Sequence, residues 1–298
     1  MSTPPLPSRS TVPERFLSAD RYRARREWFR YEGTPQRDLL RRVRESFLST
    51  TLRRSGRRSP LTLEVGPGPG RFTPILSQRS DRLVLLDASI AMLREGHQRR
   101  AKKPFDPRCR VGEVVADAGM LPLTTEISAC TVALGNVLGF AGSRAPQVFD
   151  ELVRSLRRRG VLVVETASPI LEMPSFTRGC TPRDWRRMIS QPPASLLPSL
   201  LRQGFSKVIP PASRYREEDT FQFLDPQEIR DWISDAGLSI EDQMVAAPMT
   251  GGSPELVADV THGRQDALER LVEWELFAGR RKELLMQGGH TLTAARAP

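Results

Sequence analysis

The apolar positions of this chain change their spacing several times between residues 61 and 166. Short apolar runs, bounded by polar or glycine-rich residues, alternate there with segments whose apolar residues recur every three or four positions. The runs predict strands, and the helical spacing predicts the helices that connect them. The expected strands begin at Leu61, Arg82, Val111, Ser128 and Val161. Because strands and helices alternate, the pattern predicts an α/β fold with a doubly wound, mostly parallel sheet.

The helices are expected from apolar stripes and from residues that cap helix ends. They are Pro35 to about Thr51, Phe72–Ser77, the segment that follows Ser89, and Gln147–Arg158. In the last of these, the arginines at 157–159 are expected to lie at the helix C-terminus, where cations are favourable, and Gly160 is expected to be the C-cap.

The regular pattern stops at residues 167–220, where eight prolines divide short apolar pieces. A segment of this length without periodicity is usually functional, so it predicts an inserted substrate cap or lid, with a peripheral insertion as the alternative. After it the regular elements return, as a helix at Asp225–Gly237, a strand at Leu238–Ala246, a mostly helical Pro254–Leu285 and a terminal strand at Thr291–Arg296. We therefore divide the chain into a disordered tail (1–13), a basic N-terminal helical segment (14–60), a core (61–166), the inserted cap (167–220) and the C-terminal part of the core (221–298).

The first strand of the core ends in an acid and three alternating glycines. Glu64 is followed by Gly66, Gly68 and Gly70, which allow positive φ angles and a close approach of a ligand to the backbone. A plain Gly-Pro turn is one alternative. A dinucleotide site is another, but its G-x-G-x-x-G motif places the third glycine one residue later than this chain does.

Acids also stand at the ends of the next two expected strands. Asp87 lies 21 residues after Gly66, at the spacing where nucleotide-binding folds place a carboxylate that can accept hydrogen bonds from both ribose hydroxyls. A surface aspartate at a strand end is the alternative for Asp87 taken by itself. Asp117 follows the third strand, and Asn136 follows the fourth.

These residues together resemble the motifs of class I S-adenosylmethionine-dependent methyltransferases, of the type 11, small-molecule-like kind. The resemblance covers about residues 61–166 and 221–296. It implies a seven-stranded Rossmann-like sheet whose last strand is antiparallel. It also implies that S-adenosyl-L-methionine is the cofactor and that it is bound by Glu64, Gly66, Gly68, Gly70, Asp87, Ala88, Asp117, Ala118 and Asn136. Ala129 departs from the pattern, since family members usually carry an aspartate there.

The residues that catalyse the transfer are unknown from the sequence. Methyl transfer from a sulfonium mainly requires proximity, orientation and a deprotonated nucleophile, so a dedicated base is not obligatory. Glu165, at the end of the fifth strand, and His290, at the start of the terminal strand, are the candidates for a base. A surface imidazole with no role in the reaction is the alternative for His290.

Charge bears on the identity of the methyl acceptor. The chain has a net charge of +10, and residues 1–60, with 15 Arg and 6 acidic residues, account for nearly all of it. A solvated arginine-rich face is one interpretation, and it favours a small-molecule acceptor. A nucleic-acid (rRNA or tRNA) methyltransferase that grips phosphates through residues 1–60 is the alternative, and a non-catalytic cofactor-binding protein is a second.

Composition predicts the compartment and argues against several kinds of site. No apolar run approaches the ~20 residues that span a bilayer and no apolar signal segment opens the chain, so we expect a cytoplasmic protein with no membrane partner. Cys109, Cys130 and Cys180 lie far apart and form no C-x-x-C pair, so no disulfide framework and no metal site are expected. The oligomeric state is not predicted.

Overall fold

The computed structural model describes residues 33–168, 222–285 and 289–298, apart from 55, 57, 103–104, 251–253 and 263. The disordered tail 1–13 and the first part of the basic segment 14–60 lie outside the described residues. So does nearly all of the inserted cap 167–220. Those divisions stay predictions.

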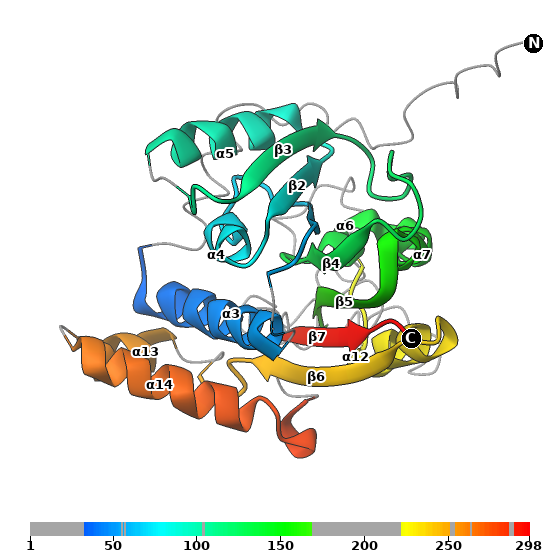
Figure 1. Cartoon of the computed structure of the whole chain (residues 1–298). Coiled ribbons are helices and arrows are strands. Elements are labelled where there is room, and N and C mark those ends of the chain that lie inside the picture. The colour runs from blue at the N-terminus through cyan, green and yellow to red at the C-terminus, as the bar shows by residue number, and fades with distance from the viewer. Residues whose placement is uncertain are drawn as a thin grey trace, which may run out of the picture.

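A seven-stranded sheet runs through the molecule in the order β3-β2-β1-β4-β5-β7-β6 (Figure 1). The strands β1 to β5 are paired in parallel, whereas β7 is antiparallel to both of its neighbours, β5 and β6. The strands are β1 Thr62–Val65, β2 Arg82–Asp87, β3 Arg110–Val115, β4 Ser128–Ala133, β5 Leu156–Ala167, β6 Ser239–Ala246 and β7 His290–Arg296. The predicted fold class is confirmed, including the antiparallel last strand.

Helices cover both faces of the sheet and bury two apolar clusters against it. Alternate residues of one strand enter different clusters, as Leu162 and Val163 of β5 do, because successive side chains of a strand point to opposite faces. The cluster on one face is completed by α3 Pro35–Arg54, α4 Thr73–Gln78, α5 Ile90–Lys102, α13 Pro254–Thr261 and α14 Gln265–Ala278. The cluster on the other is completed by α6 Val137–Ala141, α7 Ala145–Ser155 and α12 Pro226–Asp235. Two short 3-10 turns, η1 Gly142–Arg144 and η3 Lys282–Leu284, complete the described helices.

The predicted C-terminus of the helix before β5 is wrong. α7 ends at Ser155, and Leu156 is already extended, with ψ of 130°. Arg157–Arg159 therefore belong to β5, and Gly160 lies inside that strand instead of capping a helix. The reason is tertiary pairing, because Leu156 pairs with Ser128 of β4 and buries its side chain, which outweighs the helical pattern of the sequence.

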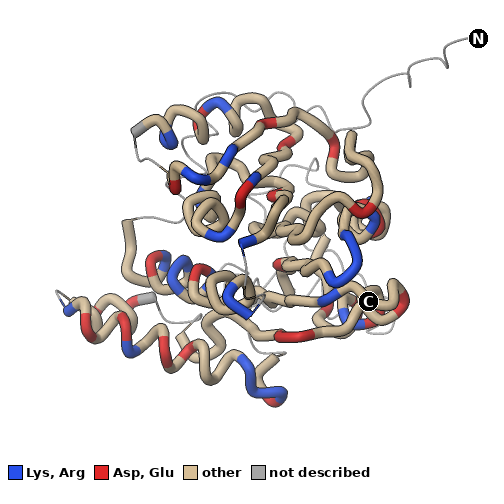
Figure 2. Tube along the Cα trace, in the orientation of Figure 1, with Lys and Arg blue, Asp and Glu red and all other residues tan. Residues whose placement is uncertain are grey.

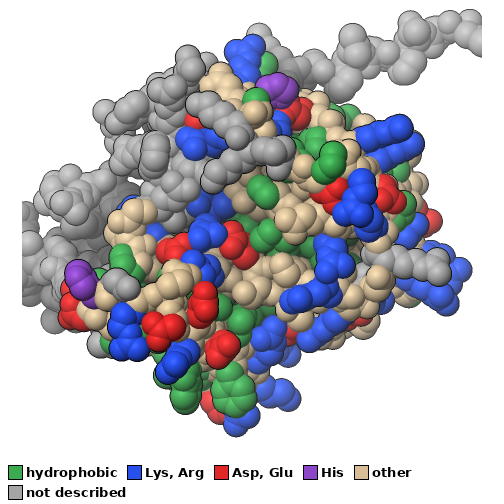
Figure 3. Space-filling view, turned by 60° about the vertical axis from the view of Figure 1, so that its left-hand side comes forward, with side chains coloured by type: hydrophobic (Ala, Val, Ile, Leu, Met, Phe, Trp, Pro, Cys, Tyr) green, Lys and Arg blue, Asp and Glu red, His purple; other side chains and the backbone are tan. Residues whose placement is uncertain are grey.

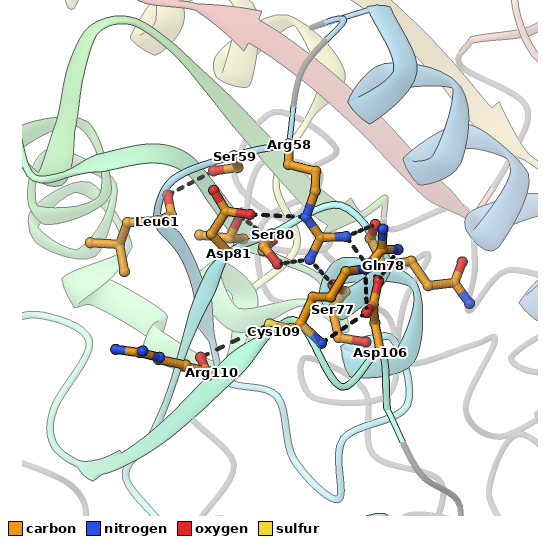
Figure 4. Close-up of polar contacts among 12 residues, drawn as sticks. Arg58, Ser59, Leu61, Ser77, Gln78, Ser80, Asp81, Asp106, Cys109 and Arg110 are labelled. Carbon is orange, nitrogen blue, oxygen red and sulfur yellow. Dashed lines mark hydrogen bonds and ion pairs between the residues drawn. The ribbon is translucent and has the colours of Figure 1, made fainter.

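Arg58 joins several segments at the amino-terminal edge of the sheet (Figure 4). Its guanidinium donates to the backbone oxygens of Ser77 and Gln78 at the C-terminal end of α4, at 3.3 and 2.8 Å. It also donates to the carboxylates of Asp81, just before β2, and Asp106, shortly before β3, at 2.9 and 2.8 Å. This arginine thus ties the segment before β1 to the starts of the neighbouring strands, at the edge opposite to the glycine motif.

Candidate functional site

The glycine motif forms a tight loop at the carboxyl end of β1. Gly66, Gly68 and Gly70 have φ angles of +65°, +54° and +80°, in the left-handed region that side chains with a Cβ rarely adopt. A Cβ on Gly66 would lie 2.5 Å from Val137 Cγ2, whereas a Cβ on Gly68 would meet no described atom within 4 Å. The loop therefore packs tightly on one side and leaves open space beside Gly68, where a ligand can approach the backbone.

Asp87 connects this loop to the end of β2. Its Oδ2 accepts a hydrogen bond from the backbone N–H of Gly68 at 2.9 Å, and its Oδ1 accepts one from Ser89 N–H at 2.8 Å. Burial raises the pKa of the Asp87 carboxyl to about 6, although both N–H donors lower it. Ala88, which follows it, is half-buried. Each carboxylate oxygen still has a lone pair for a further donor.

Glu64 lies beneath the loop as a buried carboxyl group. Its Oε2 accepts a hydrogen bond from the Thr73 hydroxyl, on the first residue of α4, at 2.9 Å. Burial raises the pKa of Glu64 to about 7, although the Thr73 hydrogen bond and the charge of Arg100 lower it. A cation bound at this place would favour the ionised carboxylate.

Asp117 follows β3 at the same edge, next to Asp87. Its Oδ2 accepts from Arg144 Nη2 at 2.7 Å, and its Oδ1 accepts from the backbone N–H of Gly119 at 2.9 Å. Ala118 is half-buried and packs against the apolar cluster that includes α7. The sequence did not indicate Arg144, because 27 residues separate it from Asp117 and no local pattern links them.

Asn136 stands three residues after the end of β4, at the N-cap of α6. It adopts a left-handed conformation, with φ of +64°, and its side chain is 6% exposed. Its Oδ1 has no hydrogen-bond partner among the described residues. The other end of the amide, Nδ2, lies 3.4 Å from Nδ1 of His290.

Glu165 is the centre of a buried charged cluster beside Asn136. The Arg44 guanidinium, from α3, donates to Glu165 Oε1 through Nη2 at 2.6 Å and through Nε at 3.0 Å. His290 Nδ1 lies 3.0 Å from the same oxygen, and the backbone N–H of Gly135 donates to Oε2 at 3.0 Å. Burial raises the pKa of Glu165, but Arg44 and His290 favour the ionised carboxylate more strongly. The pKa of Glu165 therefore lies far below its ordinary value.

Arg44, like Arg144, is a residue of the candidate site that sequence reasoning missed. A signal for it was present, since this arginine is buried among the apolar residues Val43, Phe47 and Leu48 of α3. A charged residue that is buried needs a partner. The catalytic roles of Glu165 and His290 stay predictions.

The structure brings the sequence-predicted site residues to one edge of the sheet. The glycine loop and the acids follow β1, β2 and β3, Asn136 follows β4, and Glu165 and His290 face each other across β5 and β7. This edge is where open α/β sheets bind ligands. Within the part of the chain that the structure describes, no group of three or more His, Cys, Asp or Glu side chains is placed to hold a metal ion. None of the described helices is long and apolar enough to cross a membrane.

Comparison with known proteins agrees with this arrangement. Residues 63–164 match a family model described as a methyltransferase domain. No protein with a curated description matches the chain.

Three solved structures share the fold. The N-methyltransferase NodS from Bradyrhizobium japonicum, solved with S-adenosyl-L-homocysteine, is 16% identical, with a TM-score of 0.51 over 96% of each chain. A candidate sarcosine dimethylglycine methyltransferase from Galdieria sulphuraria is 12% identical, with a TM-score of 0.51 over 85% of this chain and 84% of that one. The [4+2]-cyclase SpnF is 15% identical, with a TM-score of 0.50 over 85% of this chain and 80% of that one.

The family match confirms the predicted S-adenosylmethionine-dependent methyltransferase domain. At these identities the three structures establish the fold and leave the acceptor open, and a cyclase among them illustrates that this fold serves more than one reaction.

Proposed function

We propose that this chain, a class I S-adenosylmethionine-dependent methyltransferase, holds its cofactor across the carboxyl ends of β1 to β4 and methylates a small-molecule acceptor. The observation that carries the proposal is the glycine loop fixed by Asp87, with open space beside Gly68. The open space beside Gly68 allows a ligand to lie against the backbone of this loop. The unpaired oxygen of Asn136, at the same edge, fits a ligand that donates a hydrogen bond.

Each predicted residue has a role in this proposal that matches its chemistry. Asp87 accepts from the ribose hydroxyls with the lone pairs that its two backbone donors leave available. Asp117 accepts from the adenine amine, and the small Ala118 lets the ring lie close. Glu64, whose carboxylate is favoured by a nearby cation, faces the ammonium of the methionyl group. Asn136 lies at the methionyl end or at the acceptor.

When bound, S-adenosylmethionine supplies an activated methyl group on a sulfonium. The chain's own contribution is then to hold the acceptor in line and to exclude water. We assign acceptor recognition to residues 167–220, the predicted cap, because they begin where β5 ends at this edge of the sheet.

A small-molecule acceptor is supported by the contacts in the described part of the basic N-terminal segment, which begins at residue 33. Arg41 and Arg42 pair with Asp38 on their own helix, Arg54 pairs with Asp242, and Arg44 and Arg58 are engaged as described above. Two acidic side chains, Asp38 and Glu45, lie among the six arginines of α3 (Figure 2), and the face shown in Figure 3 carries both basic and acidic side chains. Arginines held by internal carboxylates contribute little to the release of counterions that drives binding to nucleic acid.

The assignment is tested in two steps. Calorimetric titration is expected to show binding of S-adenosylmethionine and none of NADH; no binding of S-adenosylmethionine would overturn the cofactor. The protein is then incubated with methyl-labelled cofactor and either a metabolite extract or total RNA. Label in small molecules supports the proposal, label in RNA shifts it to the nucleic-acid enzyme, and binding without any transfer supports a non-catalytic protein.

A further inference from the structure

Asn136 carries two unfavourable features at one position. A left-handed backbone is unfavourable at a residue other than glycine, and so is a buried carbonyl oxygen without a donor. Both occur at the carboxyl edge of the sheet, one residue after Gly135, whose N–H is held by Glu165. Such costs persist where the site serves a ligand. An oxygen in this setting is matched by a ligand that donates a hydrogen bond.

The state of His290 follows from its neighbours. Glu165 is ionised beside Arg44, and an ionised carboxylate can only accept hydrogen bonds. His290 Nδ1, 3.0 Å from Glu165 Oε1, must therefore carry a proton and donate it. A protonated Nδ1 cannot accept from the amide of Asn136, so the 3.4 Å contact between them leaves the amide available to another partner. Because Nδ1 of the neutral His290 ring carries the proton, Nε2 is the nitrogen that can accept a hydrogen bond.

We propose that His290 and Asn136 bind the nucleophile of the methyl acceptor, and that Arg44 and Glu165 position His290 for it. This inference rests on the proposed function and narrows it to acceptors whose nucleophile carries a proton, that is, an amine or a hydroxyl. The nucleophile donates the proton that it loses to His290 Nε2, and a second proton, where it has one, to Asn136 Oδ1.

The transfer is balanced within this set of groups. The lone pair of the nucleophile forms the bond to the methyl carbon, and the electron pair of the broken S–C bond remains on sulfur, which loses its positive charge. The proton lost by the nucleophile passes to His290 Nε2 and leaves later to water. The imidazolium that forms is stabilised by the Glu165 carboxylate, which Arg44 keeps ionised and in place.

The positioning part is tested by NMR on protein labelled with 15N in histidine. The chain has three histidines, so the ring signals of His290 can be assigned from the spectrum of His290→Gln. At about pH 8.5, well above the ordinary pKa of histidine, the ring of His290 is expected in the Nδ1–H tautomer. In Glu165→Gln the population of that tautomer should fall. The Nε2–H tautomer in the unaltered protein would overturn the inference, and this readout depends on neither cofactor nor acceptor.

The binding part is tested with labelled cofactor and a metabolite extract as the source of acceptors. His290→Gln and Asn136→Gly are compared with His97→Gln, a variant of a histidine that is 72% exposed on α5. Glycine at 136 keeps the left-handed backbone and removes only the amide. We expect label transfer to fall about 10²-fold in both site variants, with the cofactor affinity of His290→Gln within about threefold of that of the unaltered protein, and no change in His97→Gln.

Unchanged transfer in either site variant would overturn the inference while leaving the proposed function intact. If the unaltered protein binds the cofactor and transfers no label to the extract, the proposed function fails, and the tautomer of His290 still decides whether Arg44 and Glu165 position it.

Discussion

The carboxylate of Asp87 accepts a hydrogen bond from the backbone N–H of Gly68, at 2.9 Å, so the end of β2 fixes the glycine loop that follows β1. The loop is thus held in its left-handed conformation by a residue that also stands where the cofactor's ribose is expected. Because the loop is already ordered in the free protein, less conformational entropy is lost when a ligand binds. In the proposed function, one side chain therefore both fixes the shape of the loop and binds the ligand.

Asp87→Ala is expected to lower the affinity for S-adenosylmethionine by about 10²-fold or more, since it removes a charged acceptor and releases the loop. Asp81→Ala is the matched control. Asp81 lies just before β2, at the other edge of the sheet, where its side chain is 57% exposed and pairs with Arg58. Calorimetric titration checks both variants. Equal affinities in the two would contradict a role for Asp87 in binding.

Alanine at Gly66 and at Gly68 should have different consequences. Both positions have positive φ, so both variants carry about 1 kcal/mol of backbone strain. Gly66→Ala adds a clash with Val137 and is expected to lose more stability in urea denaturation, with partial recovery in the double variant that also carries Val137→Ala. Gly68→Ala places its methyl group in open space and should mainly weaken cofactor binding. Equal stability of the two single variants would contradict this difference.

Glu64 makes the stability of the ligand-free protein depend on pH. Its pKa is about 7 in the folded protein, against an ordinary 4.5, so the fold binds this proton more tightly than the unfolded chain does. The contribution is fully present below about pH 4.5 and is lost as pH rises through 7, which costs on the order of 3 kcal/mol.

Glu64→Gln, which mimics the protonated form, should therefore be more stable than the unaltered protein at pH 8 and gain much less at pH 5. Urea denaturation at both pH values measures the difference. Glu255→Gln, on an exposed residue, is the control and should show no such trend. A gain of the same size at both pH values would show that the effect does not come from this proton.

Arg44→Met should destabilise the protein by about 3–5 kcal/mol, because it leaves the Glu165 carboxylate buried without its cation. Adding Glu165→Gln should recover part of the loss, since the remaining group is then neutral. Arg41→Met, on the same helix, removes partly exposed pairs with Asp38 and Glu45 and should cost about 1 kcal/mol or less. Equilibrium denaturation checks all three. Similar losses for Arg44→Met and Arg41→Met would show that burial does not matter here.

The glycine loop and Asp87 could be predicted from the sequence because each depends on residues that are close together in the chain. Gly66, Gly68 and Gly70 are needed for one loop, and Asp87 follows at a spacing set by a single strand-helix-strand unit. The strand at Arg82–Asp87 has the predicted bounds, and Asp225 caps its helix by accepting from Gln227 N–H, as expected of an aspartate before a proline.

The features that the sequence did not predict depend on distant residues. Glu165 and Arg44 are 121 positions apart, and which of the many arginines reaches this carboxylate is decided by how α3 packs over the sheet. The prediction that the arginines at 157–159 end a helix is wrong because it, too, depends on a distant residue. Their pattern is compatible with a helix, and pairing of Leu156 with Ser128 decides the outcome.

The Arg44–Glu165 pair also limits which fragments of this chain can keep the buried charges paired. The family match ends at residue 164 and begins at 63, so the matched stretch contains neither the carboxylate nor the guanidinium. A fragment that starts at the predicted core boundary, residue 61, would keep Glu165 and discard the helix that neutralises it. The methyltransferase domain, although recognisable by itself in the sequence, is in this sense not autonomous: α3 is part of the folding unit.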